Sequence, residues 1–367
     1  MFLIVTRNFP PDIGGIQMLI GGLSENLLNH GPVKVFAYEH NDSKSYDNKS
    51  SMNIERIKGI KLFRKYRKAN LVNSYINNNS NIRAIITDHW KSLELLKDEL
   101  LKKTKTFCLL HSKEINHESG SSLNKRILKS TNKADFIISN SNFTKKLAIK
   151  IGINPSKIHV IFPGINQPKK IENLYKVQAN KIFGESFPKI ITVARLEKRK
   201  GHDKILMVIK NLKAKFPKIK YVSIGSGKEE NSLKKLLKEL SIEQEVTFID
   251  KIDEDLKLAL ISQSNLFLMP SRIEKKSIEG FGISFIEAAS YGVASIGGKD
   301  GGIPDAITHE KTGIICDGND LNSIYENVIN FFKNENFIKF GKNSKKFSEK
   351  FHWNKVVKNY LELINSN

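Results

Sequence analysis

The chain has 367 residues and carries 60 basic against 38 acidic residues, for a formal net charge of +22. This length favours two domains over one core, and a hydrophobic content of 40% excludes wholesale disorder. The two cysteines, Cys108 and Cys316, have no nearby partner and no metal-ligand spacing. This spacing argues against a disulfide framework and a zinc site, and a reducing cytoplasm fits best.

The N-terminal segment Met1–Asp12 contains a four-residue apolar run that Arg7 and two prolines soon end. That run is too short for the core of a signal peptide, and we expect it to form a buried first strand. No apolar run approaches the ~20 residues that span a bilayer. These features predict a cytoplasmic protein.

Short apolar runs alternate with amphipathic stretches, which is typical of α/β architecture. Weak periodicity and several prolines and glycines across residues 163–188 predict a domain boundary there. We expect helices at Gln17–Leu28, Leu93–Lys103 and Asn354–Ile364, and a polar loop at Asn73–Asn81. The expected strands are Phe2–Val5, Val33–Ala37, Ala84–Thr87, Thr106–Leu110, Phe136–Ser139 and His159–Phe162, followed by Ile190–Ala194, Tyr221–Ile224, Val246–Phe248, Leu266–Met269, Ala294–Ile296 and Gly313–Ile315.

Basic charge is densest near the N-terminus. Residues 1–168 hold 26 basic against 13 acidic residues, and the remainder holds 34 against 25. The run Arg56–Lys68 has seven basic residues, no acid, and interleaved apolar side chains. Three readings stay open: a solvated edge, an anionic membrane surface and, last, nucleic acid.

Two carboxylates, Glu279 and Glu287, stand eight positions apart around a glycine-bearing loop. Glycines at 280 and 282 let the backbone approach a ligand closely. Ile283 then opens an expected helix, whose free N–H groups would favour a phosphate. The alternative is a glycine-punctuated loop with two solvated acids.

Arg195 and Lys200 follow the expected strand Ile190–Ala194 and could together hold a diphosphate. The alternative is a solvated basic loop, and Arg199 is a further candidate for the phosphate contact. Gly14 and Gly15 follow the first strand, either as an ordinary strand–helix turn or as a loop that approaches a ligand.

His111 ends an apolar run, where a lone histidine is more often structural than catalytic. Asp253 and Asp255 form a formal DxD pair. Because they precede an expected helix, we interpret them as caps at its N-terminus.

The Glu279–Glu287 pattern resembles the E-x7-E signature of retaining glycosyltransferases of family 4. Segments in the order of that family agree along nearly the whole chain, and the subgroup of phosphatidyl-myo-inositol mannosyltransferase-like enzymes is the most similar. The segments are FPPDIGGIQ (9–17), VARLEKRKGHDKIL (193–206), IGSGKEENSL (224–233), MPSRIEKKSIEGFG (269–282), GGIP (301–304), KTG (311–313) and FHWNKVVKNYLEL (351–363).

The resemblance implies an α/β fold of the GT-B type, with two doubly wound Rossmann-like domains that face a central cleft. It places an acceptor-binding domain at 1–168, a nucleotide-sugar-binding domain at 169–350, and a final helix at 351–367 that returns to the first domain. The implied reaction moves a hexose from UDP- or GDP-hexose to a glycolipid or polysaccharide acceptor, without a cofactor and without a metal ion. The enzyme would work peripherally at the inner face of the cytoplasmic membrane.

The resemblance also implies roles for single residues. Glu279, His111, Arg195 and Lys200 would be catalytic. His111 is the weakest match, because Ser112 follows it where the family has glycine or aspartate. The nucleotide sugar would contact Gly14, Gly15, Arg195, Lys200, Gly225, Gly282, Ile283 and Glu287.

Two rivals remain at this point. A sugar-nucleotide epimerase of the same fold would share the nucleotide site but use no acceptor. A basic nucleic-acid-binding protein is suggested by the net charge alone, and we expect no nucleic acid partner.

Overall fold

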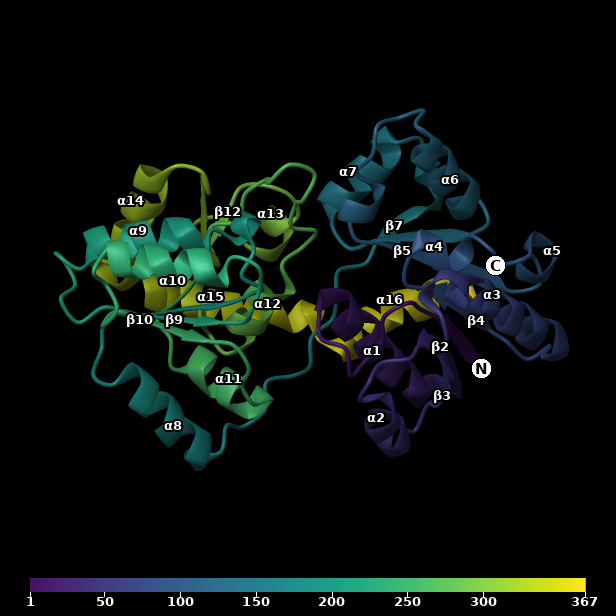
Figure 1. The fold of residues 1–367 in the computed structure, drawn as a ribbon, viewed down its shortest axis with the longest axis horizontal. Coiled ribbons are helices and arrows are strands. Elements are labelled where there is room, and N and C mark those ends of the chain that lie inside the picture. The colour runs from purple at the N-terminus through teal and green to yellow at the C-terminus, as the bar shows by residue number, and fades with distance from the viewer. Residues whose placement is uncertain (367) are drawn as a thin grey trace. The chain divides into compact units, whose positions relative to one another are not determined.

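The structure is a computed structural model that describes residues 1–366. The chain divides into two compact units. Unit 1 comprises Met1–Asn166 together with the segment from Phe351 onward, and unit 2 comprises Gln167–Lys350. Each unit is built on one parallel sheet with helices around it (Figure 1).

Unit 1 contains a seven-stranded sheet, as far as residues 1–366 show, in the order β3-β2-β1-β4-β5-β6-β7. All pairings are parallel. Phe2 of β1 lies level with Val33 of β2 and with Ala84 of β4. The strands are β1 (Phe2–Val5), β2 (Val33–Tyr38), β3 (Asn53–Ile57), β4 (Ala84–Thr87), β5 (Lys105–Leu110), β6 (Phe136–Ser139) and β7 (Ile158–Val160).

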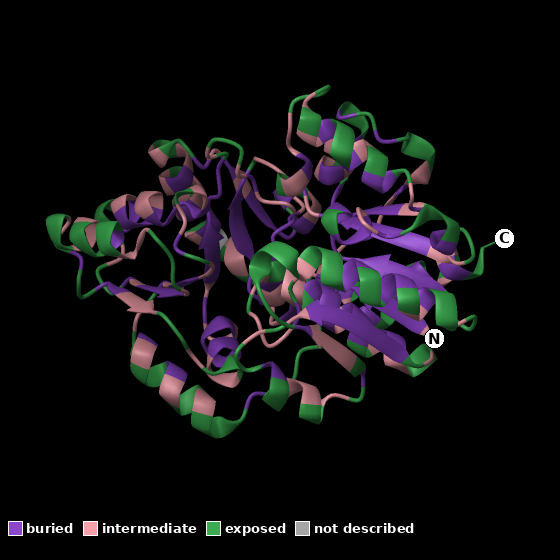
Figure 2. Cartoon of the chain, turned by 45° about the vertical axis from the view of Figure 1, so that its right-hand side comes forward, coloured by how far each residue is buried: buried purple, intermediate pink, exposed green. Residues whose placement is uncertain are grey.

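The α-helices of unit 1 are α1 (Gly15–Leu27), α2 (Ser43–Lys49), α3 (Lys61–Asn78), α4 (Trp90–Leu93), α5 (Asp98–Leu101), α6 (Ser122–Thr131), α7 (Asn142–Lys150) and α16 (Trp353–Asn365). Figure 2 shows the buried sheet of this unit behind helices whose outer faces are exposed. Among the described residues, no helix is both long enough and apolar enough to cross a membrane.

Unit 2 contains a six-stranded parallel sheet, within the described part of the chain, in the order β10-β9-β8-β11-β12-β13. Its strands are β8 (Lys189–Val193), β9 (Lys220–Ile224), β10 (Val246–Ile249), β11 (Leu266–Met269), β12 (Ser295–Gly298) and β13 (Gly313–Cys316). Its α-helices are α8 (Asn173–Phe183), α9 (His202–Leu212), α10 (Glu230–Glu239), α11 (Glu254–Ser262), α12 (Ile283–Ser290), α13 (Ile303–Ala306), α14 (Leu321–Phe332) and α15 (Asn336–Ser348).

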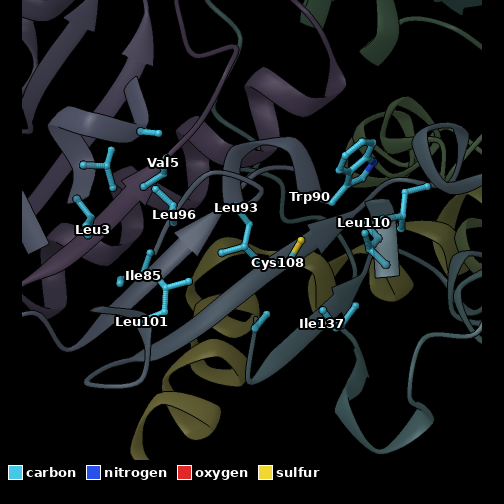
Figure 3. Packing of buried hydrophobic residues seen from close by; sticks show 14 of the residues in the cluster. Leu3, Val5, Ile85, Trp90, Leu93, Leu96, Leu101, Cys108, Leu110 and Ile137 are labelled. Atoms are coloured by element: carbon cyan, nitrogen blue, oxygen red, sulfur yellow. The ribbon is translucent and has the colours of Figure 1, made fainter. Parts of the chain in front are cut away.

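Strand β1 shows why the apolar runs of this chain become central strands. All four residues of FLIV are buried. Because successive side chains of a strand point to opposite faces, Leu3 and Val5 enter one core and Phe2 and Ile4 the other. Figure 3 shows the first of these cores, in which Leu3 and Val5 join residues of neighbouring elements.

Helix α16 belongs to the second core of unit 1. It lies against α1 (Figure 1), and Trp353 packs with the apolar residues of β1. A Cβ atom added at Gly22 or Gly164 would approach the Trp353 ring to 2.5 Å or 2.4 Å. These two glycines therefore make room for the indole.

Three expectations about local structure are wrong. The segment Asn73–Asn81 was expected to be a loop, but α3 continues to Asn78 because Val72 and Ile76 are buried on one helical face. The expected helix Leu93–Lys103 is broken, since the Asn73 side chain accepts the backbone N–H of Lys97 (3.1 Å). Strand β3 was missed, because it lies at the sheet edge and its sequence NIERI is largely polar.

We predict that Trp353→Ala lowers the free energy of unfolding of unit 1 by about 3–5 kcal/mol, the usual cost of emptying a buried aromatic site. Trp353 is 5% exposed. Urea denaturation followed through Trp90, which is buried in the same unit, measures the change. The control Leu62→Ala removes an exposed side chain of unit 1 and should cost less than about 0.5 kcal/mol. Equal losses in the two variants would contradict this packing.

Candidate functional site

The sheet of unit 2 reverses its strand order between β8 and β11, which lie next to each other. In open parallel sheets, ligands bind outside the carboxyl ends of the strands at such a switch point. The loops that follow these two strands carry Arg195–Gly201 and Pro270–Gly282. The topology therefore brings the basic loop and the Glu279 loop to one edge.

The two loops meet in a charge cluster. Lys200 Nζ and Arg199 Nη1 each lie 2.5 Å from Oε2 of Glu279. All three side chains are largely buried, with 10–14% of their area exposed. Both cations bind the same oxygen, and Oε1 of Glu279 makes no hydrogen bond within residues 1–366. One face of this carboxylate is thus anchored and the other remains available.

Burial and pairing act in opposite directions on these groups. Burial raises the pKa of Glu279, but the charges and hydrogen bonds of Lys200 and Arg199 outweigh it and lower the pKa to about 2. Burial also lowers the pKa of Lys200, although Glu279 opposes that shift. Glu279 is therefore a carboxylate at any physiological pH.

The two arginines of this loop lie in different surroundings. Arg199, a further candidate from the sequence, is 11% exposed and contacts both Glu279 and Glu197. Arg195 is 69% exposed and lies 3.1 Å from Glu197, not beside Glu279. The short 3-10 turn Lys198–Lys200 lies before Gly201, and both Arg199 and Lys200 contact the same carboxylate. Arg195 remains free to reach a ligand from the edge.

Glycines allow the backbone segments of the site to pack closely. Gly302 N–H donates to the Glu279 carbonyl (3.0 Å), and a Cβ at Gly302 would lie 2.0 Å from the carbonyl oxygen of Gly280. The GGIP segment therefore supports the Glu279 loop. Gly225, with φ at 133°, approaches the Ala194 carbonyl at the start of the basic loop.

Helix α12 begins directly after Gly282, which has a φ of 88° and ψ of 60°. Ile283 is its first residue, and Glu287 lies on its second turn, as the sequence predicts. The first N–H groups of an α-helix have no intrahelical acceptor and favour an anion. Glu279 therefore lies in the loop that leads into a potential anion-binding helix end.

Sequence reasoning missed Lys257. This lysine of α11 lies 3.0 Å from Glu287 and 2.8 Å from Glu254. Burial lowers the pKa of Lys257, but the two carboxylates outweigh that effect and raise it. The three-residue spacing of Glu254 and Lys257 was the only local sign that Lys257 forms an ion pair, because its other partner, Glu287, lies 30 residues away. Glu287 is thus oriented by an ion pair.

The remaining site candidates lie in unit 1. Gly14 and Gly15 form the start of α1, and a Cβ at Gly15 would have no neighbour within 4 Å. His111 follows β5, and its Nε2 lies 2.7 Å from the Asp88 carbonyl oxygen. Ser112 has a φ of 87°, a region that favours glycine. Ser112 therefore holds a backbone conformation that residues with a side chain rarely adopt.

The DxD pair does not form a metal site in the described structure. Asp253 occupies the position before α11 but makes no side-chain cap hydrogen bond, contrary to the capping expectation. Asp255 pairs with Lys169. Within residues 1–366 there is no group of three or more His, Cys, Asp or Glu residues that could hold a metal ion.

Comparisons with known proteins agree with this architecture. Residues 176–350 match the family described as "Glycosyl transferases group 1", and residues 13–167 match "Glycosyltransferase Family 4". Together the two matches cover most of the chain, and each covers most of one unit. The chain belongs to the glycosyltransferases with the GT-B fold.

Individual relatives of this glycosyltransferase are distant. The chain is 24% identical over 347 residues to a GDP-mannose-dependent alpha-(1-6)-phosphatidylinositol monomannoside mannosyltransferase of Mycobacterium tuberculosis, covering 89% of this chain and 87% of the relative. HepE of Anabaena, solved in complex with UDP and glucose, superposes with a TM-score of 0.81 at 16% identity, over 100% of both chains. A glycosyltransferase of Rickettsia africae superposes with a TM-score of 0.80 at 18% identity, over 100% of this chain and 99% of the other.

We predict that Glu279→Gln destabilises this glycosyltransferase by about 3–5 kcal/mol at neutral pH, because it leaves two buried cations without their counter-charge. The folded-state pKa of Glu279 lies below its unfolded value. Its contribution is therefore present above the unfolded pKa of about 4.3 and is lost as the pH falls from about 5 toward 2.

Urea denaturation of both proteins at several pH values measures this difference, which should shrink in acid. The control Glu239→Gln removes an exposed carboxylate that lies 3.7 Å from Lys235, and should change stability by less than about 0.5 kcal/mol. An undiminished difference at low pH would show that Glu279 acts through shape and not through charge.

Proposed function

We propose that this glycosyltransferase is a retaining hexosyltransferase, which moves a hexose from UDP- or GDP-hexose to a lipid-linked or cell-envelope glycan acceptor. The observation that carries the proposal is the cluster of Lys200, Arg199 and Glu279 beside the first turn of α12. Cations and free N–H groups suit a diphosphate, and the open oxygen of a carboxylate suits a sugar hydroxyl. A nucleotide sugar presents both groups side by side.

The charges of the cluster match the chemistry of glycosyl transfer. When the glycosidic bond breaks, negative charge grows on the diphosphate and the sugar gains oxocarbenium character. Lys200, Arg199 and the exposed Arg195 can stabilise the leaving group, together with the N–H groups that open α12. We expect no metal ion to be needed, because cationic side chains supply this stabilisation.

The two carboxylates of the E-x7-E pattern would then have different partners. Glu279, anchored through Oε2, would accept a hydrogen bond from a donor-sugar hydroxyl at Oε1 and position the anomeric carbon. Glu287, oriented by Lys257, would accept hydrogen bonds from the ribose hydroxyls of the nucleotide. The family resemblance supports retention of configuration and a role for His111 near the donor sugar.

The names of the relatives guide the choice of substrates. HepE was solved with UDP and glucose, and the mycobacterial relative is named as a GDP-mannose-dependent enzyme acting on a phosphatidylinositol monomannoside. These names support a nucleotide diphosphate hexose as donor and a glycolipid as acceptor. Both UDP-sugars and GDP-sugars are therefore candidate donors.

A surface of unit 1 supports a membrane-bound acceptor. The α3 patch, at the start of α3, has exposed apolar side chains beside basic ones. Such a mixture suits an anionic leaflet, where apolar side chains enter the interface and cations attract lipid headgroups. We propose that this patch docks on the inner face of the cytoplasmic membrane. The patch consists of Ile60, Lys61, Leu62, Phe63, Arg64, Lys65 and Tyr66.

The ends of the basic run do not belong to this patch. The side chain of Arg56 is 6% exposed and pairs with Asp47 (2.7 Å), and Lys68 is buried. Lys68 lies one turn beyond Arg64 and Lys65, on the face of α3 that packs against the sheet. Arg56 and Lys68 are therefore not available to a membrane, and the reading of the run Arg56–Lys68 as a membrane surface is wrong for these two residues.

The donor site is tested by turnover. After a thermal-shift panel of UDP- and GDP-hexoses identifies the donor, Arg195→Ala and Lys200→Ala should each lower kcat by about 100-fold, the range for losing one electrostatic donor to a transition state. The double variant should lose less than the product of the two, since both residues serve one charge.

Lys198→Ala is the matched control, because this neighbouring lysine is exposed and lies 3.9 Å from Glu274. Its kcat should stay near that of the wild type. If Lys198 proves essential while Lys200 is dispensable, the assignment of the basic loop is wrong. If no variant alters turnover, the leaving-group mechanism is wrong.

The α3 patch is tested by vesicle sedimentation. Replacing Lys61, Arg64 and Lys65 with Gln should abolish binding to phosphatidylglycerol-containing vesicles at low salt, at about 1 kcal/mol per basic residue near the surface. The control replaces the exposed residues Lys234, Lys235 and Lys238 of α10, which changes the net charge equally. Loss of vesicle binding in both variants would mean that net charge, and not this patch, attracts the protein.

A further inference from the structure

Arg272 is a buried arginine that lies close to the charge cluster of unit 2 but is not part of it. It stands three residues after the end of β11, and its side chain is 5% exposed. Its guanidinium group forms a fork with Asp203, in which Nη1 donates to Oδ1 (3.0 Å) and Nη2 donates to Oδ2 (2.8 Å). Because the two residues are 69 positions apart, no local pattern in the sequence joins them.

Asp203 gives this arginine a fixed anchor. It is the second residue of α9, and its carboxylate lies at the helix end that favours negative charge. The start of α9 packs tightly against the segment that follows β11. Gly201 has a φ of 81°, and a Cβ atom there would lie 2.6 Å from the Pro270 carbonyl oxygen. Arg272 is therefore attached to the first turn of a helix.

The backbone of Arg272 in turn holds the basic loop. Its N–H donates to the Arg199 carbonyl (2.9 Å), and in the described chain this hydrogen bond joins the Arg199 backbone to the loop after β11. The Arg199 side chain contacts Glu279 Oε2 (2.5 Å). A shift of the Arg199 peptide would move its guanidinium group relative to that carboxylate. The contacts thus form a path from α9 through Asp203 and Arg272 to Arg199.

The Glu279 loop has supports of its own. Ile273 N–H donates to Asp300 Oδ2 (3.2 Å), and Gly302 N–H donates to the Glu279 carbonyl (3.0 Å). Asp300 and Gly302 belong to the turn after β12, so this turn holds the loop both before and at Glu279. The Arg272 side chain takes part in neither hydrogen bond. Its influence on the cluster therefore passes through Arg199.

Stability alone is a weak reason for this ion pair. Replacing a buried ion pair by well-packed apolar side chains is often neutral or stabilising. The fork provides direction instead, because a guanidinium group binds both oxygens of a carboxylate in one plane. Direction matters for groups that stabilise a transition state, since a misplacement of about 1 Å can lower the rate by about 100-fold.

We propose that Arg272 is a positioning residue for glycosyl transfer, which fixes Arg199 where its guanidinium group meets both Glu279 and the leaving diphosphate. The inference rests on the proposed function, because it gives Arg272 no contact with a substrate and lets it act through Arg199. Lysine cannot replace Arg272 in this role, since a single ammonium group does not reproduce the planar fork.

The test is a double-mutant cycle on kcat, measured on the full chain with the identified donor and its acceptor. Arg272→Lys should lower kcat by about tenfold or more, and Arg199→Ala should lower it at least as much. When Arg199 is already alanine, adding Arg272→Lys should change kcat by less than about twofold, because no guanidinium group remains to be positioned. A merely structural arginine would lower kcat by the same factor in both backgrounds.

A second variant covers the case in which Arg272→Lys fails to fold. Asp203→Asn keeps the shape of the partner but removes the charge that the fork binds, and it should show the same dependence on Arg199. The control Arg126→Lys breaks a similar fork in unit 1, where Nε and Nη2 of Arg126 contact Glu94 (2.8 Å and 3.1 Å). Its kcat should stay near that of the wild type.

Three results would overturn the proposal. They are an unchanged kcat in Arg272→Lys and Asp203→Asn, equal losses in both backgrounds, and an equal loss in Arg126→Lys. If Lys200→Ala still lowers kcat alongside any of them, the proposed function stands and the positioning role alone fails. If Lys200→Ala and Arg199→Ala both leave kcat unchanged, the leaving-group mechanism fails and the positioning role fails with it.

Discussion

The arrangement of unit 2 depends on one carboxylate oxygen, Oε2 of Glu279, which accepts from both Lys200 and Arg199. A buried pair of cations is unfavourable without a counter-charge, and a buried carboxylate is unfavourable without cations. Each group therefore stabilises the other at the end of a different strand. The pairing joins the loop after β8 to the loop before α12, and it leaves Oε1 of Glu279 open beside free N–H groups.

The two units share one topological feature but place different polar groups at it. Each has a parallel sheet whose strand order reverses once, and each places its unusual polar groups at that reversal. In unit 2 the cations are paired with Glu279, which suits a ligand with both phosphate and hydroxyl groups. In unit 1 Asp88 accepts hydrogen bonds from the Ser92 hydroxyl and from the backbone N–H of Arg7.

Local patterns were enough to predict most strands, the loop position of Glu279 and the helical position of Glu287, because continuous apolar runs and glycines act over a few residues. Contacts between distant segments could not be predicted. Arg199 and Glu279 are 80 residues apart, and nothing near Arg199 shows that it is buried. The same holds for Lys257 beside Glu287 and for Lys68, whose basic neighbours in the sequence are exposed. Strand β3 was missed for a related reason, since an edge strand needs no apolar run.

The most direct test of the account is calorimetric titration of Glu279→Gln with the free nucleoside diphosphate of the identified donor. If Glu279 is the counter-charge of Lys200 and Arg199 and contacts the sugar and not the diphosphate, its neutral replacement leaves both cations uncompensated and should bind the nucleoside diphosphate at least as tightly as the wild type. Its turnover should nevertheless fall by about 100-fold. Nucleoside diphosphate binding that is weakened by about tenfold, or turnover that is unchanged, would contradict the account.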